Sequence, residues 1–501
     1  MDLRSDSDFY IGCKVLAPIA HYLGLSIDKF NFLFCQCVLL LVSFPYHIYL
    51  HPSWTSASMR HTVALMVGLG FGYFCFGYQI LHLVLQATLV YIVLHAVGPE
   101  QMHKWALALG MAYLSAIHVL RQTYDYGGYH LDVTGPLMVA TQKVTSLAFN
   151  LHDGLLPTTA TLHPEQRRQL VRKMPTLLEY YGYVLHYHTL MCGPLVFYND
   201  YIDFIRGDQY WRHTISTSMR GHPKNPSREP SPNGAVAGKL LISLVCALCV
   251  IYLIPANPID YILDEQYLDH TGPCKQMLYL VWATSLHRLR YYHAWCLGEA
   301  ICNAAGFGFN GYTSDGQARW NLLSNVDICT IETSLSLREL LVAWNKSTQT
   351  WLRIVWNKST QTWLRIVAYE RLNPRVRTQL TFVLSAAWHG FYPGYYLTFS
   401  VGSLFTLAAR AVRRSVRPMV QGRVAHTFYD LLTCLSTRLA VAYIVFPFLL
   451  LDFGSSIKVY RNFWFGGHVV SLLAIYILPR LLPPAPSTSV ATAGSQPPDT
   501  G

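Results

Sequence analysis

Charged side chains are scarce in this sequence. Asp, Glu, Lys and Arg together make up 13% of its 501 residues, whereas hydrophobic residues make up 52%. A soluble domain carries roughly 25% charged residues. The shortage excludes an ordinary water-soluble globular protein, and we predict an integral membrane protein.

The apolar residues are gathered into long runs. About 20 residues cross a bilayer as a helix, so such runs predict membrane spans. The run at 61–98 is long enough for two passes. We therefore predict an all-α, polytopic protein with about eleven transmembrane helices. The runs lie near 31–50, 61–98, 104–120, 178–197, 236–254, 276–286, 377–402, 430–452 and 463–482.

The amino-terminal letters, MDLRSDSDFY, lack the basic, apolar and small-residue order of a cleavable signal peptide. We expect the first spans to act as the insertion signal. The stretches 221–234 and 483–501 are rich in Pro, Gly and Ser and poor in large apolar residues, so we expect both to be disordered. Residues 1–482 then form one polytopic domain, followed by a disordered tail.

The sequence lacks a recognisable metal-ligand pattern. Its twelve cysteines are scattered, and the one CxxC pair, Cys246 and Cys249, lies within an apolar run. A zinc site would need companion ligands at matching spacing. We predict that these cysteines are small buried side chains and that the protein holds neither a metal nor a resident cofactor.

The formal net charge of +11 is concentrated in three basic stretches, 163–173, 206–230 and 410–418. Basic loops tend to remain cytosolic, so we predict a cytosolic position for 206–230. Basic stretches beside a membrane also suit anionic headgroups or a phosphate-bearing ligand. Because they adjoin membrane segments, we do not expect nucleic acid as a partner.

Two segments, 124–154 and 287–312, are apolar but interrupted by polar groups. Arg288, Arg290, His293 and Glu299 would be costly in contact with lipid. We predict broken or re-entrant segments that line an internal polar chamber, where irregular backbone is tolerated. Such residues would also line the path of a transporter, but the inverted repeats typical of transporters are not evident in the sequence.

An isolated histidine, His389, stands between Trp388 and Gly390 in an apolar span. An intramembrane ionisable group indicates a functional site, and histidine suits proton transfer near neutral pH. Upstream, WNKSTQTWLRIV occurs twice in tandem, at 344–355 and 356–367, and gives two candidate amides, Asn345 and Asn357. In an unbroken helix the two would differ by about 120° and 18 Å, so both cannot serve one site.

Six blocks of the sequence resemble the membrane-bound O-acyltransferase family, and within it the lysophospholipid acyltransferase branch of animals. The resemblance covers about residues 30 to 480. The blocks are TGPLMVATQKVTSLAFNLHDG, HYHTLMCGPLVFYNDYIDFI, YYHAWCLGEAICNAAGFGFNGY, RWNLLSNVDICTIETS, WNKSTQTWL and SAAWHGFYPGYY.

The resemblance implies catalytic roles for a His in a W-H-G context and an Asn in a W-N context. These are His389 and one of Asn345 and Asn357. It also implies a fatty acyl-CoA donor as co-substrate and a lysophospholipid acceptor. The headgroup of the acceptor can be serine, ethanolamine, choline or inositol. We expect a multi-pass location in the endoplasmic reticulum membrane. An acyltransferase acting on proteins, sterols or diacylglycerol is the closest alternative.

The chemistry can also be derived from the residues. Moving an acyl group from a thioester to an alcohol needs a base near the hydroxyl and a donor to the developing oxyanion. His389 can accept the proton, and an Asn amide can hold the substrate or the oxyanion. No Ser or Cys stands in a recognisable activating setting beside a histidine, so we favour direct transfer over an acyl-enzyme.

The family pattern has one WNKSTQTWL segment and this chain has two. The spacing from Glu332 favours Asn345, whereas the spacing to His389 favours Asn357. We favour Asn357, because an insertion upstream of it leaves its connection to His389 unchanged. Lys358, Arg365 and Arg371 are candidates for the phosphates of coenzyme A, with a solvated face as the alternative. We interpret the tryptophans of the repeat as membrane-interface anchors.

Overall fold

Helices account for the regular secondary structure in the part of the chain that the structure describes. The computed structural model describes residues 10–482 except 129, 157–161, 163, 211–228, 314, 345–362, 370 and 374–375. Within these limits the one β-feature is an isolated bridge between Tyr312 and Ala318. The prediction of an all-α protein is confirmed for the described residues, and the predicted tail, 483–501, lies outside them.

The first half of the chain forms a series of long helices, α3 to α7, followed by shorter ones. They are α2 (Ala17–Tyr22), α3 (Ile27–Tyr49), α4 (Ala57–Phe76), the 3-10 turn η1 (Gly77–Gln79), α5 (Ile80–Ala96), α6 (Met102–Tyr124), α7 (Thr134–Leu155), α8 (Pro164–Arg168), α9 (Leu177–Leu185), α10 (Tyr187–Leu190) and α11 (Tyr198–Arg206).

The second half begins with two long helices that pack against each other. Its elements are α13 (Asn233–Ala256), η2 (Ile259–Leu263), α14 (Glu265–His270), α15 (Pro273–Ala304), α16 (Ile328–Thr333), α17 (Leu337–Trp344), the π-helical turn η3 (Arg365–Tyr369), α19 (Arg377–His389), α20 (Pro393–Val416), η4 (Arg417–Met419), α21 (Arg423–Leu450), α22 (Phe453–Asn462), α23 (Gly466–Tyr476) and α24 (Leu478–Leu481).

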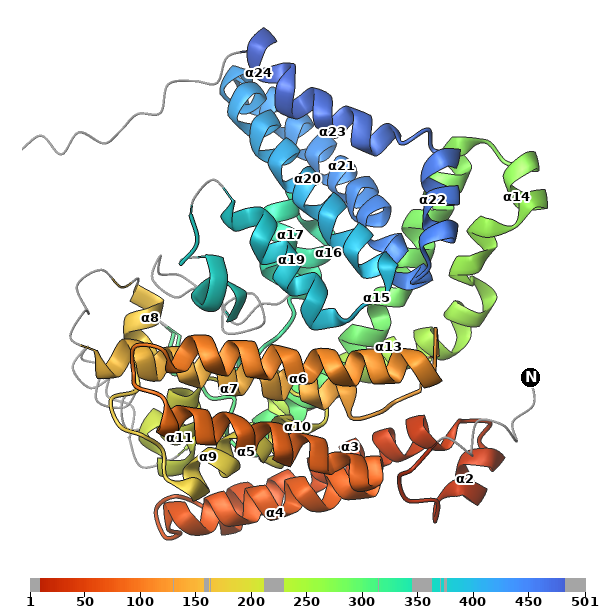
Figure 1. Ribbon diagram of the computed structural model, residues 1–501. Coiled ribbons are helices and arrows are strands. Elements are labelled where there is room, and N and C mark those ends of the chain that lie inside the picture. The colour runs from red at the N-terminus through yellow and green to blue at the C-terminus, as the bar shows by residue number, and fades with distance from the viewer. Residues whose placement is uncertain are drawn as a thin grey trace, which may run out of the picture.

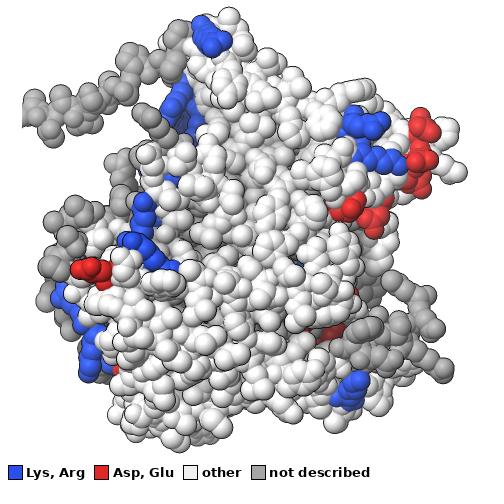
Figure 2. All heavy atoms as spheres, in the orientation of Figure 1, with Lys and Arg blue, Asp and Glu red and all other residues white. Residues whose placement is uncertain are grey.

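Several helices are long and apolar enough to cross a bilayer. Among the described residues, four segments meet this test, and a pair bent by 73° is a fifth if it counts as one span. One face of the molecule is almost free of charge, with charged side chains in small groups near its edges (Figure 2). The chain is therefore a multi-pass membrane protein. The segments are Ile27–Tyr49, Ala57–Ala96, Asn233–Leu263 and Arg423–Leu450, with Phe453–Asn462 and Gly466–Leu481 as the bent pair.

Two predicted spans are broken in the structure. The run at 178–197 becomes the short helices α9 and α10, which meet at His186, followed by irregular chain. The run at 377–402 becomes α19 and α20, separated by residues 390–392. Glycine and proline stand at the second break, where Gly390 leaves helical geometry and Pro393 begins the next helix.

The two segments that we predicted to be broken each contain a long continuous helix, although residues 130–133 and 305–311 lie outside helices. The helix α7 runs from Thr134 to Leu155, and α15 runs through the polar region up to Ala304. Pro136 does not interrupt α7 because it lies in the first turn, where its missing N–H group has no helical partner to bind. The polar side chains are instead kept from lipid by burial of the whole helix, since most residues of α7 are buried.

Two large hydrophobic clusters make up most of the core, and a third, small one joins α13 to the end of α15. One is built mainly from α3 to α11, and the other from α15 to α17 and α20 to α22. In Figure 1, α3 to α7 occupy the lower part of the view and α20, α21 and α23 the upper part. The long helix α15 packs against α13, α3 and α21 and so connects both parts.

A buried lysine stabilises the break between α9 and α10. Lys143 of α7 is 1% exposed. Its Nζ lies 3.3 Å from the carbonyl oxygen of Tyr183 and 3.0 Å from that of Val184. Both carbonyl groups belong to the last turn of α9, where the helix offers them no N–H partner. The ammonium group has three donors and binds both.

We predict that Lys143→Leu lowers the free energy of unfolding by about 2 kcal/mol, because it leaves two buried carbonyl groups without a donor. The measurement is thermal unfolding of the purified protein in detergent micelles. The control is Lys104→Leu, since Lys104 lies exposed on α6. Equal midpoints for the two variants would show that Lys143 does not stabilise the break.

Candidate active site

A large cavity lies where the sequence predicts an internal chamber. Its volume is about 2250 Å³. Residues of α6, α7, α15, α17, α19, α20, α21 and α23 line it, and most of these side chains are aromatic or aliphatic. Helices from both halves of the chain therefore contribute to one site.

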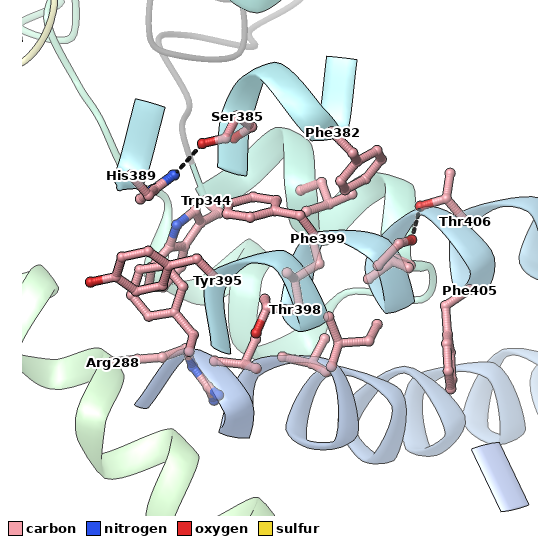
Figure 3. A pocket seen from close by; sticks show the side chains of 18 of the residues that line it. Arg288, Trp344, Phe382, Ser385, His389, Tyr395, Thr398, Phe399, Phe405 and Thr406 are labelled. Atoms are coloured by element: carbon pink, nitrogen blue, oxygen red, sulfur yellow. Dashed lines mark hydrogen bonds between the residues drawn. The ribbon is translucent and has the colours of Figure 1, made fainter. Parts of the chain in front are cut away.

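His389 is the last residue of α19 and lines this cavity. Its ring lies among aromatic rings, with centroid distances of 4.9 Å to Phe399, 5.4 Å to Phe448 and 6.0 Å to Tyr395. Figure 3 shows His389, Tyr395 and Phe399 around the same space. His389 therefore lines an internal cavity, whereas the chamber that we predicted to be polar has mainly apolar walls around this residue.

A backbone hydrogen bond selects the tautomer of His389. Nδ1 lies 2.7 Å from the carbonyl oxygen of Ser385, the dashed line in Figure 3. A carbonyl oxygen only accepts, so Nδ1 must carry the proton and donate it. In the neutral ring, Nε2 then has a free lone pair. The geometry presents His389 as a proton acceptor.

The neighbours of His389 fix the end of α19. Trp388 donates from Nε1 to the carbonyl oxygen of Met138 on α7, at 3.0 Å. Gly390 has φ of 126° and ψ of −163°, a backbone region that essentially only glycine adopts. In the W-H-G motif, Trp388 attaches α19 to α7 and Gly390 lets the chain leave the helix directly after the histidine.

The two asparagines and Lys358 lie outside the described residues, because the structure does not describe 345–362. The residues on either side are described. Trp344 ends α17, and its ring lies 5.3 Å from that of Trp295 and 5.7 Å from that of Tyr291. It also lines the cavity.

Trp363, at the other side of this gap, is completely buried. It donates from Nε1 to Oγ1 of Thr145 at 2.8 Å, and its ring lies 6.0 Å from that of Trp388. The prediction of an interfacial anchor is therefore wrong for Trp363, because the protein itself surrounds the indole. Trp363 belongs to the hydrophobic cluster of the first half, whereas Trp344 packs against that of the second.

The two described arginines predicted to bind coenzyme A have different surroundings. Arg365, on the π-helical turn η3, lines the cavity. Arg371 is engaged with the protein: Nη2 lies 2.6 Å from Oδ2 of Asp153, and the guanidinium carbon lies 4.7 Å from the ring centre of Phe149. Its Nε also donates to the carbonyl oxygen of Ile366 at 2.8 Å. These contacts give Arg371 a structural role beside η3.

One end of the cavity is basic. The sequence identified 410–418 as a basic loop, but the structure places 410–416 in the last turns of α20. Arg410 donates to Oγ1 of Thr378 on α19 at 3.2 Å. The side chains of Arg413 and Arg414 are exposed. The cavity-lining arginines at the start of α19, at the end of α20, and on α17, η3 and η4 are Arg338, Arg365, Arg377, Arg410, Arg413, Arg414 and Arg417.

The four polar residues of α15 that the sequence analysis named differ in their exposure. Glu299 is buried, with Lys239 of α13 at 2.8 Å, and Nδ1 of His293 lies 2.9 Å from Oγ of Ser243. Arg288 is buried as well. Arg290 is exposed rather than buried, but it lines the cavity, as predicted for this segment.

An ion network that the sequence analysis missed holds α16 in place. Arg288 donates from Nε and Nη2 to the carboxylate of Glu332, at 3.0 and 2.7 Å, and Tyr292 donates to it at 2.7 Å. Arg438 of α21 donates to the carbonyl oxygen of Ile331 at 2.6 Å. Arg438 interrupts the apolar run 430–452, and this intramembrane charge was the signal for the network.

Comparison with known proteins supplies a family. The sequence model of MBOAT, the membrane-bound O-acyltransferase family, matches residues 119–354 and 355–446, so the junction of its two segments lies inside the tandem repeat. "Lysophospholipid acyltransferase 6" of Drosophila melanogaster is 42% identical over 95% of this chain, which spans 65% of that protein's length. "Membrane-bound glycerophospholipid O-acyltransferase 2" of Homo sapiens is 39% identical over 93% of this chain and 88% of its own length.

A more distant relative is found in yeast. "Lysophospholipid acyltransferase" of Saccharomyces cerevisiae is 31% identical over 69% of this chain and 57% of its own length. The similarity to the Drosophila and human proteins covers nearly the whole chain, so it includes helices from both halves of the chain that line the cavity.

Proposed function

The chain belongs to the membrane-bound O-acyltransferase family, and from that premise we propose that it transfers a fatty acyl group from acyl-CoA to the free hydroxyl of a lysophospholipid. The resemblance carried by the six sequence blocks is confirmed. The observation that carries the proposal is the free Nε2 of His389 in a large, mainly apolar cavity. The named relatives favour a lysophospholipid acceptor over a protein, a sterol or diacylglycerol, and no relative named here is a transporter.

The proposed reaction is a direct transfer. Nε2 of His389 takes the proton of the acceptor hydroxyl as its oxygen attacks the thioester carbonyl. The tetrahedral intermediate collapses, so the C–O bond remains and the C–S bond breaks. The leaving thiolate receives the proton from the imidazolium and departs as free coenzyme A. An Asn amide donates to the oxyanion, a contribution typically worth about a hundred- to a thousandfold in rate.

The shape of the cavity supports acyl-CoA as the donor. Arg377 lies at the start of α19, twelve residues before His389, which corresponds to about 18 Å along the helix. The basic end suits the phosphates of coenzyme A, with the extended pantetheine arm reaching toward the histidine. Arg365 and the arginines of α20 are the described candidates for phosphate contacts, and Lys358 remains a prediction.

We propose the following setting for this reaction. The protein is one polytopic unit over residues 1–482, with about eleven spans. It resides in the endoplasmic reticulum membrane with the basic loop 206–230 in the cytosol. Acyl-CoA serves as co-substrate, without a metal or a resident cofactor. Acceptors with serine, ethanolamine or choline headgroups place the enzyme in phospholipid remodelling.

The first prediction concerns the activity and His389. Membranes containing the expressed chain should acylate at least one lysophospholipid of a headgroup panel with labelled oleoyl-CoA. His389→Ala should lower the rate at least about a hundredfold, because it removes the general base. The matched control is His426→Ala, an exposed histidine away from the cavity, at equal protein level. Full activity of His389→Ala would refute its role, and an inert parent would refute the proposed function.

The second prediction concerns the basic end. Replacing Arg413 and Arg414 together by Gln should raise KM for acyl-CoA about tenfold or more, since charge-assisted hydrogen bonds to phosphate are lost. KM for the lysophospholipid should change little. The control is Arg423→Gln, an exposed arginine that does not line the cavity. An increase confined to KM for the lysophospholipid would assign the basic end to the acceptor headgroup instead.

The third prediction concerns the two asparagines. Asn357 precedes His389 by 32 residues (389 − 357), and the connection includes Trp363, which is fixed beside Trp388. An extra copy upstream leaves this connection unchanged. We expect Asn357→Ala to lower the rate about a hundredfold and Asn345→Ala to leave it nearly unchanged.

The two single variants are compared at equal protein level with the parent. Loss of transfer in Asn345→Ala alone would show that the upstream copy serves the site, in keeping with Trp344 at the cavity wall. Full activity of both variants would remove the amide from the mechanism.

A further inference from the structure

A second histidine lies beside the end of α19. His118 belongs to α6, is 8% exposed and lines the same cavity as His389. It does not occur in any of the six sequence blocks that carry the family resemblance. Its contacts are with the backbone around the W-H-G motif.

The first contact is a hydrogen bond. Nε2 of His118 lies 3.1 Å from the carbonyl oxygen of Trp388. Because a carbonyl oxygen only accepts, Nε2 carries the proton and donates it. Trp388 is in the last turn of α19, where the helix has no N–H group for its carbonyl. His118 supplies that missing donor from another helix.

The second contact is with Gly390 and shows why a residue without a side chain suits this position. A Cβ atom on Gly390 would lie 3.2 Å from Nδ1 and 3.4 Å from Cγ of His118. The imidazole ring therefore packs directly against the backbone of Gly390, which has the left-handed φ of 126°. The carbonyl before His389 and the glycine after it are thus both held by one side chain.

A further contact fixes the same turn from its other side. The N–H group of Gly127 donates to the hydroxyl oxygen of Tyr392 at 2.9 Å, and that hydroxyl donates to the carbonyl oxygen of Asp125 at 3.3 Å. Residues 125–127 directly follow α6. The end of α6 and the chain after it therefore hold residues 388–392 at two points.

We propose that His118 is a positioning residue for His389. By binding the carbonyl oxygen of Trp388 and packing on Gly390, it fixes the last turn of α19, so that the ring of His389 keeps its bond to Ser385 and directs Nε2 into the cavity. We assign no proton transfer to His118, because its Nε2–H is bound to the carbonyl oxygen of Trp388 and its other ring nitrogen, Nδ1, packs against the backbone of Gly390. The inference rests on the proposed acyl transfer.

Two substitutions at this position separate the possible roles. In His118→Gln the amide nitrogen can take the place of Nε2–H as a donor, whereas His118→Leu keeps bulk and loses the donor. We expect His118→Leu to lower kcat about tenfold to a hundredfold, as a misplaced catalytic group does, with both KM values within about twofold. We expect His118→Gln to keep kcat within about threefold of the parent, because the bond is retained.

The contrary outcomes are distinct. If His118→Gln loses as much activity as His118→Leu, the imidazole acts through its own proton and the positioning role is refuted. If His118→Leu has the activity of the parent, the bond to Trp388 is dispensable and the inference is wrong as well.

A readout without activity keeps this inference separate from the proposed function. Amide hydrogen exchange of a peptide covering residues 386–392 is measured for the parent and both variants in the same detergent. Exchange should rise in His118→Leu and stay at the parental level in His118→Gln, while peptides of α13 remain unchanged and report an intact fold. Equal exchange in all three proteins refutes the inference. A parent that acylates no lysophospholipid refutes the proposed function alone, because the exchange comparison still decides the role of His118.

Discussion

The constraint on which this structure depends is that polar groups cannot be left facing lipid. Each buried charge described above is bound to a group on another helix. Lys143 binds the carbonyl groups that end α9, Arg288 binds Glu332 of α16, and Glu299 binds Lys239 of α13. The polar residues of the interior therefore act as cross-links between helices. They also fix the wall of the cavity, because α15 contributes both to these links and to the wall.

The same principle determines the position of the reactive group. A helix end buried in protein needs donors for its last carbonyl groups. At α19 His118 binds the carbonyl oxygen of Trp388, and the N–H group of Gly390 binds that of Ala386. Trp388 lies in the hydrophobic cluster of the first half, whereas Phe448 of α21, beside the ring of His389, is part of the second half. His389 thus lies at the boundary between the two hydrophobic clusters, next to the cavity, while its helix end is held by hydrogen bonds.

The sequence was sufficient for the class of protein and for its central residue. The scarcity of charge and the long apolar runs predicted a helical membrane protein, and the isolation of His389 predicted its position in an internal chamber. The sequence did not reveal contacts between distant residues, such as Arg371 with Asp153 and Trp363 with Thr145, each 218 positions apart. Arg371 was therefore interpreted as a ligand for phosphate although a buried carboxylate binds it.

The predicted positions of helix breaks were also wrong, because they depend on contacts with other helices. Polar residues in 124–154 were taken as a sign of a broken segment, because a regular helix with such side chains cannot face lipid. The structure solves the same problem by surrounding α7 with other helices. Conversely, the break at His186 interrupts an apolar run, and what stabilises it is Lys143, whose side chain comes from elsewhere in the chain. The pattern of apolar residues indicates which parts of a helix are buried. It does not show which distant side chain stabilises the end of that helix.

The length of α15 has a consequence for the membrane around the protein. Its 32 residues extend for about 48 Å, whereas the hydrocarbon layer of a bilayer is about 30 Å thick. A helix of this length does not fit upright within the hydrocarbon layer, so α15 either tilts or extends beyond it. Thr284, Arg288 and Trp295 of α15 lie in the cavity wall. One wall of the cavity is therefore formed by a helix that is longer than the hydrocarbon layer is thick.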